Sequence, residues 1–281
     1  MLSASQLKYD VDFNKNLGEL IEIMKLASVS QLNQFRLYRK PSVDFIKQLE
    51  IILGYIYPLR PEHIFFRPAV GEGVSAVVLV SSDEGFLGEL NALLVNKLTG
   101  IRKDNDEIIV LGNQGAQYLK ELRIEFKQFN SISDKLELDQ MEELRDYVFE
   151  LYFKRKVSRL WLIYPRFVSV SLQQIELEEL LPLTGALFSK ITKVSGELLL
   201  EPGFDSAVSG WVQLWLLGKI YHIFWSAKLA EFSARIMHLE GSVQELGRIN
   251  QNLKLEYFKY LHSLSDKTIR EVSAARMLRK H

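Results

Sequence analysis

A heptad of apolar residues near the C-terminus constrains the fold of this chain more than any other feature. The residues at alternating three- and four-residue steps are Phe232, Ile236, Leu239, Val243, Leu246, Leu253, Tyr257, Tyr260 and Leu264, with Asn250 as one polar interruption. Apolar residues at these steps form the seam of a coiled coil. No proline follows Pro202, so a helix can continue without a break through this region. The sequence therefore predicts a long, shaft-like helix.

The length of this helix requires a partner. A helix from about residue 209 to 275 would be roughly 100 Å long at 1.5 Å per residue, too long for a small domain to bury. The first 40 residues also lack proline and carry a helical stripe of apolar residues. That stripe consists of Leu17, Leu20, Ile21, Met24, Ala27 and Leu32, with Lys15, Glu19, Glu22 and Lys25 largely off it. We predict that the N-terminal helix (1–57) and the C-terminal helix (208–281) form an antiparallel coiled coil, and that another protein covers the rest of the longer helix.

The segment between the two arms, residues 58–207, has the pattern of an α/β domain. Continuous β-branched runs at 75–81 and 107–111 are typical of buried parallel strands. We expect further strands at 123–126, 159–164, 167–172 and 196–201, and helices at 87–98, 112–122 and 134–153. Strands that alternate with helices favour a layered, Rossmann-like domain. The predicted fold class is therefore α/β, with long terminal helices that form an antiparallel coiled coil.

Composition excludes several classes of function. Lys+Arg and Asp+Glu both number 35, so no bulk charge favours nucleic acid or lipid as a partner. The absence of cysteine rules out disulfides and thiolate chemistry. The N-terminus has no signal-peptide or transit-peptide pattern. The most apolar stretch, 211–225, is too short to cross a bilayer and is interrupted by polar residues.

No pattern of catalytic, cofactor or metal-binding residues emerges. Gly85 and Gly88 follow a predicted strand, but the rest of a dinucleotide fingerprint is missing, and Glu84 and Glu89 would repel phosphate. The five histidines are scattered at spacings that do not suit a metal. Asn250 at a seam position is best interpreted as a residue that sets the register of the coiled coil. We expect no cofactor and no metal.

Five segments in order resemble the gamma subunit of F-type ATP synthases. They are 23–27 (IMKLA), 82–91 (SDEGFLGELN), 164–169 with 180–183 (YPRFVS and LLPL), 231–236 (EFSARI) and 253–257 (LKLEY). Each segment alone is weakly specific, but the five together cover nearly the whole chain. The chain departs from the family pattern at Glu84 and Glu89, where arginine and glycine are usual. It departs again at Leu261 and His262, where the family has Arg-Gln.

The resemblance implies a central rotor shaft that couples ion translocation through a membrane ring to ATP synthesis or hydrolysis in a catalytic hexamer. The chain itself would catalyse nothing, and would lie on the cytoplasmic face of the membrane as a peripheral protein. Its expected partners are the catalytic and nucleotide-binding subunits, a small epsilon-type rotor-foot subunit and the membrane ring. The residues implied to contact the hexamer are Met24, Leu261, His262, Met277 and Leu278. Those implied to contact the ring or foot are Glu84, Phe86, Leu87 and Glu89.

Two alternatives remain open from the sequence. One is a shaft-like paralogue that serves as an adaptor in a rotary motor without ion transport, which the departures at Glu84, Glu89, Leu261 and His262 motivate. The other is a small-molecule α/β enzyme with a coiled-coil arm, which the lack of a catalytic constellation disfavours.

Overall fold

The structure is a computed structural model, which describes residues 4–38, 41, 43–67, 73–184, 187–188, 200–201 and 203–278. The chain divides into two compact units. Unit 1 comprises Met1–Val29 and Ile236–His281, and unit 2 comprises Ser30–Arg235. Helices α1 (Ala4–Tyr38) and α6 (Phe204–Leu278) each contribute to both units. Residues 30–57 and 208–235, which the sequence assigned to the two arms, lie in unit 2.

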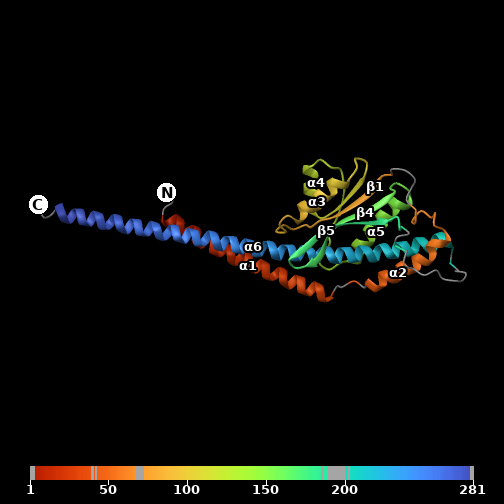
Figure 1. The fold of residues 1–281 in the computed structure, drawn as a ribbon, viewed down its shortest axis with the longest axis horizontal. Helices are drawn as coiled ribbons and strands as arrows, with labels where there is room; N and C mark the ends of the chain where they lie inside the picture. Colours follow the sequence, from red (N-terminus) through yellow and green to blue (C-terminus); the bar gives the residue numbers. More distant parts are fainter. Residues whose placement is uncertain are drawn as a thin grey trace. The chain divides into compact units, whose positions relative to one another are not determined.

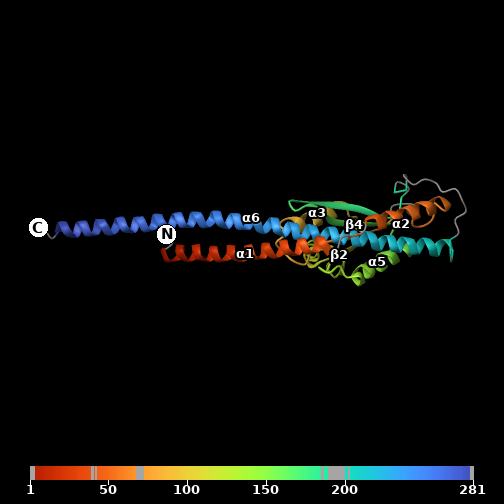
Figure 2. The ribbon, with the colours of Figure 1, turned by 90° about the horizontal axis from the view of Figure 1, so that it is seen from below.

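Unit 1 is an antiparallel pair of helices. The N-terminal part of α1 and the C-terminal part of α6 run side by side in both views (Figures 1 and 2), and Lys25 Nζ lies 2.7 Å from Glu240 Oε2. The α6 residues turned inward are Ile236, Leu239, Val243, Leu246, Asn250, Leu253, Tyr257 and Tyr260, whereas most residues between them are exposed. The predicted coiled coil and its α6 seam are therefore confirmed up to Tyr260.

The seam ends earlier than the sequence predicted, because Leu264 is 49% exposed. With Lys25 opposite Glu240, antiparallel pairing places Ala4, the first residue of α1, opposite about residue 261. Residues 261–275 of α6 are all exposed. The shorter helix thus leaves the end of the longer one uncovered within unit 1, as expected.

The stripe predicted for α1 is partly wrong. Leu20 is 54% exposed and Ala27 is also exposed, whereas Leu17, Ile21 and Met24 are half-buried as expected. Lys25, predicted to lie off the stripe, is turned inward, with a side chain only 17% exposed. Its charge is matched by Glu22 Oε2 at 2.8 Å and by Glu240. Carboxylates on both helices therefore allow a lysine to occupy a seam position.

Unit 2 contains a five-stranded sheet with the order β3-β2-β1-β4-β5 among its described residues. The strands are β1 (Ser75–Val80), β2 (Glu107–Leu111), β3 (Lys127–Phe129), β4 (Arg159–Ser169) and β5 (Leu172–Leu181). The first four are mutually parallel, and β5 pairs antiparallel with β4. This mixed sheet confirms the predicted α/β class.

Three strand predictions differ from the structure. The edge strand expected at 123–126 lies at 127–129, and the strands expected on either side of Pro165 are the single strand β4. Pro165 is tolerated because β4 pairs with β1 only up to Ile163. Two residues later, the Phe167 N–H donates to Ser226 Oγ of α6 rather than to a strand. The strand expected at 196–201 falls largely outside the described residues.

Helices cover both faces of the sheet (Figure 1). Helices α3 (Leu90–Ile101) and α4 (Asn113–Glu121) bury Leu94, Leu98 and Leu119 against the β-branched side chains of one face. Helix α5 (Leu138–Phe153) and the first part of α6 lie on the other face. Helix α2 (Val43–Ile56), with the short 3-10 helix η1 (Tyr57–Leu59), packs along α6, where Trp215 Nε1 donates to Glu50 Oε1 at 3.3 Å.

Candidate partner-contact site

The loop between β1 and α3, residues 81–89, carries four of the predicted contact residues, and we call it the β1–α3 loop. Its first residue is fixed against the turn that follows β2. Ser81 Oγ donates to Leu111 O at 2.6 Å and accepts from the Gly115 N–H at 3.0 Å. Gly112 has a φ of +90°, and a Cβ there would lie 2.6 Å from Ser81 O, so only glycine fits. The loop therefore leaves the sheet from a rigid base.

The next residues of the loop are held by polar contacts, which are largely buried at Ser82 and exposed at Asp83. The Asn91 side-chain amide donates to Ser82 Oγ at 2.9 Å, and Ser82 Oγ in turn donates to Glu84 O at 2.9 Å. Asp83 Oδ1 accepts from the Asn113 N–H at 2.8 Å, and Asp83 Oδ2 accepts from Ser131 Oγ. These contacts satisfy the polar groups of the loop and fix its path.

Two neighbouring apolar residues of the loop have opposite surroundings. Leu87 is only 5% exposed and packs with Leu90 and with Ala234 of α6. Phe86 is 56% exposed and has a φ of +62°, a conformation that side chains other than glycine rarely adopt. Leu87 therefore supports the loop from inside, whereas Phe86, with Glu84 and Glu89, forms its exposed surface.

An ionic network fastens the loop to α6, and we call it the α6 clamp. Arg235 Nη2 lies 2.9 Å from Glu84 Oε2 and 2.9 Å from Glu231 Oε1. Lys228 Nζ lies 3.1 Å from Glu231 Oε2 and 2.9 Å from Asp134 Oδ1. Three of these groups are nearly buried, because Arg235, Lys228 and Glu231 side chains are 7%, 9% and 11% exposed. One helix face therefore holds two cations around one shared carboxylate.

Pairing with carboxylates keeps the Lys228 amine of the α6 clamp charged. Burial by itself would lower the pKa of Lys228, but the carboxylates of Glu231 and Asp134 outweigh burial and raise the pKa of this amine. The sequence singled out Glu231 and Arg235 as part of a motif but gave no sign of their link to Glu84. No periodic pattern could have indicated a contact between residues so far apart in the chain.

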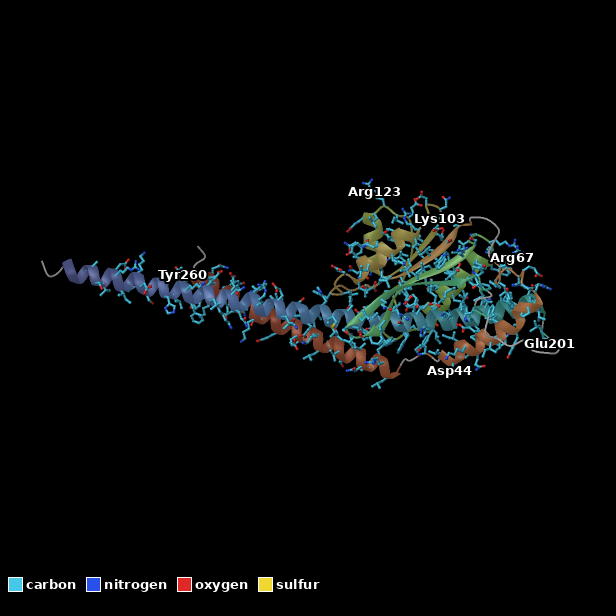
Figure 3. All side chains as sticks on the ribbon, viewed as in Figure 1. Asp44, Arg67, Lys103, Arg123, Glu201 and Tyr260 are labelled. Atoms are coloured by element: carbon cyan, nitrogen blue, oxygen red, sulfur yellow. The ribbon has the colours of Figure 1, made fainter. Side chains whose placement is uncertain are left out.

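The residues predicted to meet the catalytic hexamer lie in unit 1. Met24 is half-buried on α1, between the exposed side chains of Ile23 and Leu26. Leu261 and His262 are exposed on α6, next to Tyr260 at the end of the seam (Figure 3). Met277 and Leu278 close α6, and their side chains fall outside what the structure describes. The structure thus places these residues on two helices and does not gather them into one pocket among the described side chains.

Within the described ranges, no group of three or more histidine, aspartate and glutamate side chains is arranged to hold a metal ion. None of the described helices is both long enough and apolar enough to span a membrane.

A family model described as ATP synthase matches residues 4–260. The chain therefore belongs to the ATP synthase family. This match covers α1, unit 2 and most of α6, the elements that make up the coiled coil and the sheet.

Relatives place the chain more narrowly within that family. The ATP synthase gamma chain of Clostridium beijerinckii is 28% identical over 95% of each chain. The gamma chain of Mycoplasmopsis synoviae is 23% identical over 98% of each chain. The chain is accordingly a gamma subunit, and its role is that of the rotor shaft of an F-type ATPase, as the sequence predicted.

Solved structures share the fold. A chain in the OSCP/F1/c-ring structure of the Euglena gracilis mitochondrial ATP synthase has a TM-score of 0.71 at 14% identity, over 98% of this chain and 93% of that one. A chain in the rotor of the same synthase has a TM-score of 0.66 at 16% identity, over 93% of this chain and 98% of that one.

Proposed function

We propose that the chain is the non-catalytic shaft through which a catalytic hexamer and an ion-translocating membrane ring exchange rotation. The observation that carries this proposal is the continuity of α6. One uninterrupted helix of 75 residues supplies both the coiled-coil seam of unit 1 and buried residues of unit 2. Its backbone hydrogen bonds join each turn to the next, so a torque on one unit reaches the other without passing through a loop.

The shaft would act on the catalytic sites by unequal contact. It can bias a site only through contacts that differ between the open and closed states of that site. Unit 1 offers such contacts, because Tyr9, Phe13, Leu20 and Ile23 of α1 are more than half exposed and apolar. With Met24, Leu261, His262, Met277 and Leu278, these residues would bear on the catalytic and nucleotide-binding subunits.

The geometry of the β1–α3 loop supports a different partner from the one that the resemblance implied. The loop packs on Ala234 and Arg235, the last residues of α6 in unit 2. At the other end of the part of α6 that belongs to unit 2, Asp205 Oδ1 in the first turn of the helix lies 3.0 Å from Arg60 Nη1. These two contacts are about 45 Å apart along the helix, from 30 residues at 1.5 Å each.

The loop lies beside the last α6 residues of unit 2, and the same helix continues from Ile236 into unit 1, the part that would enter the hexamer. We therefore assign Glu84, Phe86 and Glu89 to the rim of the hexamer, with Leu87 as their buried support. The end of unit 2 around Arg60 and Asp205 would face the epsilon-type foot subunit and the membrane ring. In this role the chain would be a peripheral protein on the cytoplasmic face of the membrane, with no direct lipid insertion and no nucleic-acid partner.

Two observations favour the adaptor alternative. Glu84, where the family usually has arginine, is paired with Arg235, and Leu261 and His262 replace the usual Arg-Gln pair. These changes suit a shaft that couples to unusual partners.

Affinity purification of a tagged chain, with identification of the proteins that accompany it, tests the proposal. Recovery of both hexamer and ring subunits would support the synthase shaft. Recovery of hexamer subunits without ring subunits would support the adaptor, and recovery of neither would refute both.

A further inference from the structure

A cavity of about 300 Å³ lies at the end of the sheet where β1 and β4 begin. Three short segments line it: residues 62–67, residues 73–74 before β1, and residues 152–158 between α5 and β4. Its apolar lining consists of Ile64, Val74, Tyr152 and Val157. Apolar walls with a few converging polar groups are the usual composition of a small-molecule site.

The charged groups around this cavity are mostly cationic. Among the described lining residues, Arg67, Arg155 and Lys156 are cationic and Glu62 is the one carboxylate. The cavity beside β2 and β3 differs, because Arg102, Arg123 and Lys127 there are outnumbered by four acidic residues. No described residue forms an ion pair with Arg67 or Arg155, whereas the neighbouring Lys154 pairs with Glu150. The positive charges of Arg67 and Arg155 beside the cavity are therefore not matched by a described carboxylate.

The backbone at Arg155 adds a second observation. Arg155 has a φ of +53°, in the left-handed region that favours glycine. A glycine would form this turn without strain, so the Arg155 side chain is carried beside the cavity on a constrained backbone. The turn is held by the Lys156 N–H, which donates to Leu151 O at 3.0 Å.

The walls are joined to one another by hydrogen bonds. The Tyr152 hydroxyl donates to Ile64 O at 2.9 Å, which ties α5 to the first segment. Val74 O accepts from both the N–H and the hydroxyl of Ser158, at 2.7 and 3.1 Å. The cavity is therefore preformed, and its cations are carried on fixed backbone.

We propose that this cavity binds a phosphate group carried on a small organic body, with Arg155 and Arg67 as the phosphate-binding residues. The planar guanidinium group matches phosphate oxygens bidentately, and the apolar lining suits the body that carries the phosphate. The phosphate can belong to an anionic phospholipid headgroup or to a soluble ligand, and the experiment distinguishes these sources.

The test compares Arg155→Gly with Arg123→Gly in the full-length chain. Arg123 is a matched control, since it has a φ of +56° and lines the acid-rich cavity instead. It lies well apart from Arg67 in Figure 3. Because glycine relieves strain at both positions, both variants should unfold at the same temperature as the parent or higher.

Two probes are used: inorganic phosphate in calorimetry, and vesicles of one part phosphatidylglycerol to three parts phosphatidylcholine in flotation. We expect the parent and Arg123→Gly to bind one of these probes, and Arg155→Gly to bind it about tenfold more weakly or worse. Binding of phosphate identifies a soluble ligand, and binding of the vesicles alone identifies a headgroup. Binding of neither probe by the parent, or equal binding by both variants, would overturn the proposal.

Discussion

Replacement of Arg235 by methionine should release the β1–α3 loop from α6. Methionine keeps much of the length and apolar volume of the arginine stem but removes the guanidinium. Arg235 is bonded to Glu231 and to Glu84, so Arg235→Met leaves both carboxylates without this partner. The two carboxylates are affected unequally, because Glu231 is nearly buried and Glu84 is 73% exposed.

The size of the effect follows from this difference. Removal of one partner of a buried ion pair costs about 3–5 kcal/mol. Glu231 keeps Lys228 Nζ at 3.1 Å, so we expect a cost at or below the lower end of that range, about 2–3 kcal/mol. Loss of the exposed Glu84 partner should cost less than about 1 kcal/mol, because water screens it. Glu84→Gln is therefore the matched control, and it should be nearly neutral.

Tryptophan fluorescence during urea unfolding measures this loss of stability in unit 2, the unit that contains the α6 clamp. All four tryptophans, Trp161, Trp211, Trp215 and Trp225, lie in unit 2. The reasoning would be refuted if Arg235→Met unfolded at the same urea concentration as the parent. It would also be refuted if Glu84→Gln cost as much as Arg235→Met, since the exposed pair would then dominate.

Three further predictions test other parts of the account. Gly241→Ala should stabilise α6 by about 0.5–1 kcal/mol, since nothing lies within 4 Å of the added Cβ; a lower melting temperature by circular dichroism would contradict this. Leu246→Asp should prevent assembly of the rotary complex, because it places a charge in the seam of the coiled coil. Leu255→Asp is the control, since Leu255 is 59% exposed and its replacement should leave the coiled coil intact. Equal assembly yields for the two variants would show that Leu246 is not in the seam. Burial lowers the pKa of His63 despite its contact with Asp205, so the folded state takes up its proton less readily and stability should fall as the pH drops below about 6.5. His63→Asn should flatten that decline in urea titrations, and an unchanged slope would contradict the assignment.

The sequence predicted the C-terminal helix well because one physical pattern controls it. Apolar residues at heptad steps must face a partner, and all of those from Ile236 to Tyr260 do so. The N-terminal helix was predicted less well, because its inward face includes Asn14, Gly18, Lys25 and Ser28. Polar residues at a seam carry no hydrophobic signal, and Lys25 is accommodated only by Glu22 and Glu240.

Strand β5 was missed for a related reason. Its sequence, LQQIELEELL, contains three glutamates and resembles a solvated helix. In the structure these charges are matched across elements: Glu176 by Arg166 at 2.9 Å, Glu179 by Arg159 at 3.7 Å, and Glu178 by Lys219 of α6. Pairing between distant segments overrides the local propensity here.

The candidate site was predicted as a set of residue types and not as an arrangement. The motif at 82–91 located the β1–α3 loop, but only the fold shows that Leu87 is buried and that Glu84 reaches Arg235. Contacts of this kind depend on which helix crosses which loop, which no local pattern encodes.

Rotation of unit 2 in an assembled complex is the most direct test of the shaft. The chain has no cysteine, so Lys97→Cys on the exposed side of α3 provides a unique attachment point for an optical probe. With the hexamer immobilised and Mg-ATP added, the account predicts continuous rotation of the probe in one direction. A probe that remains stationary while the same complexes hydrolyse ATP would contradict it.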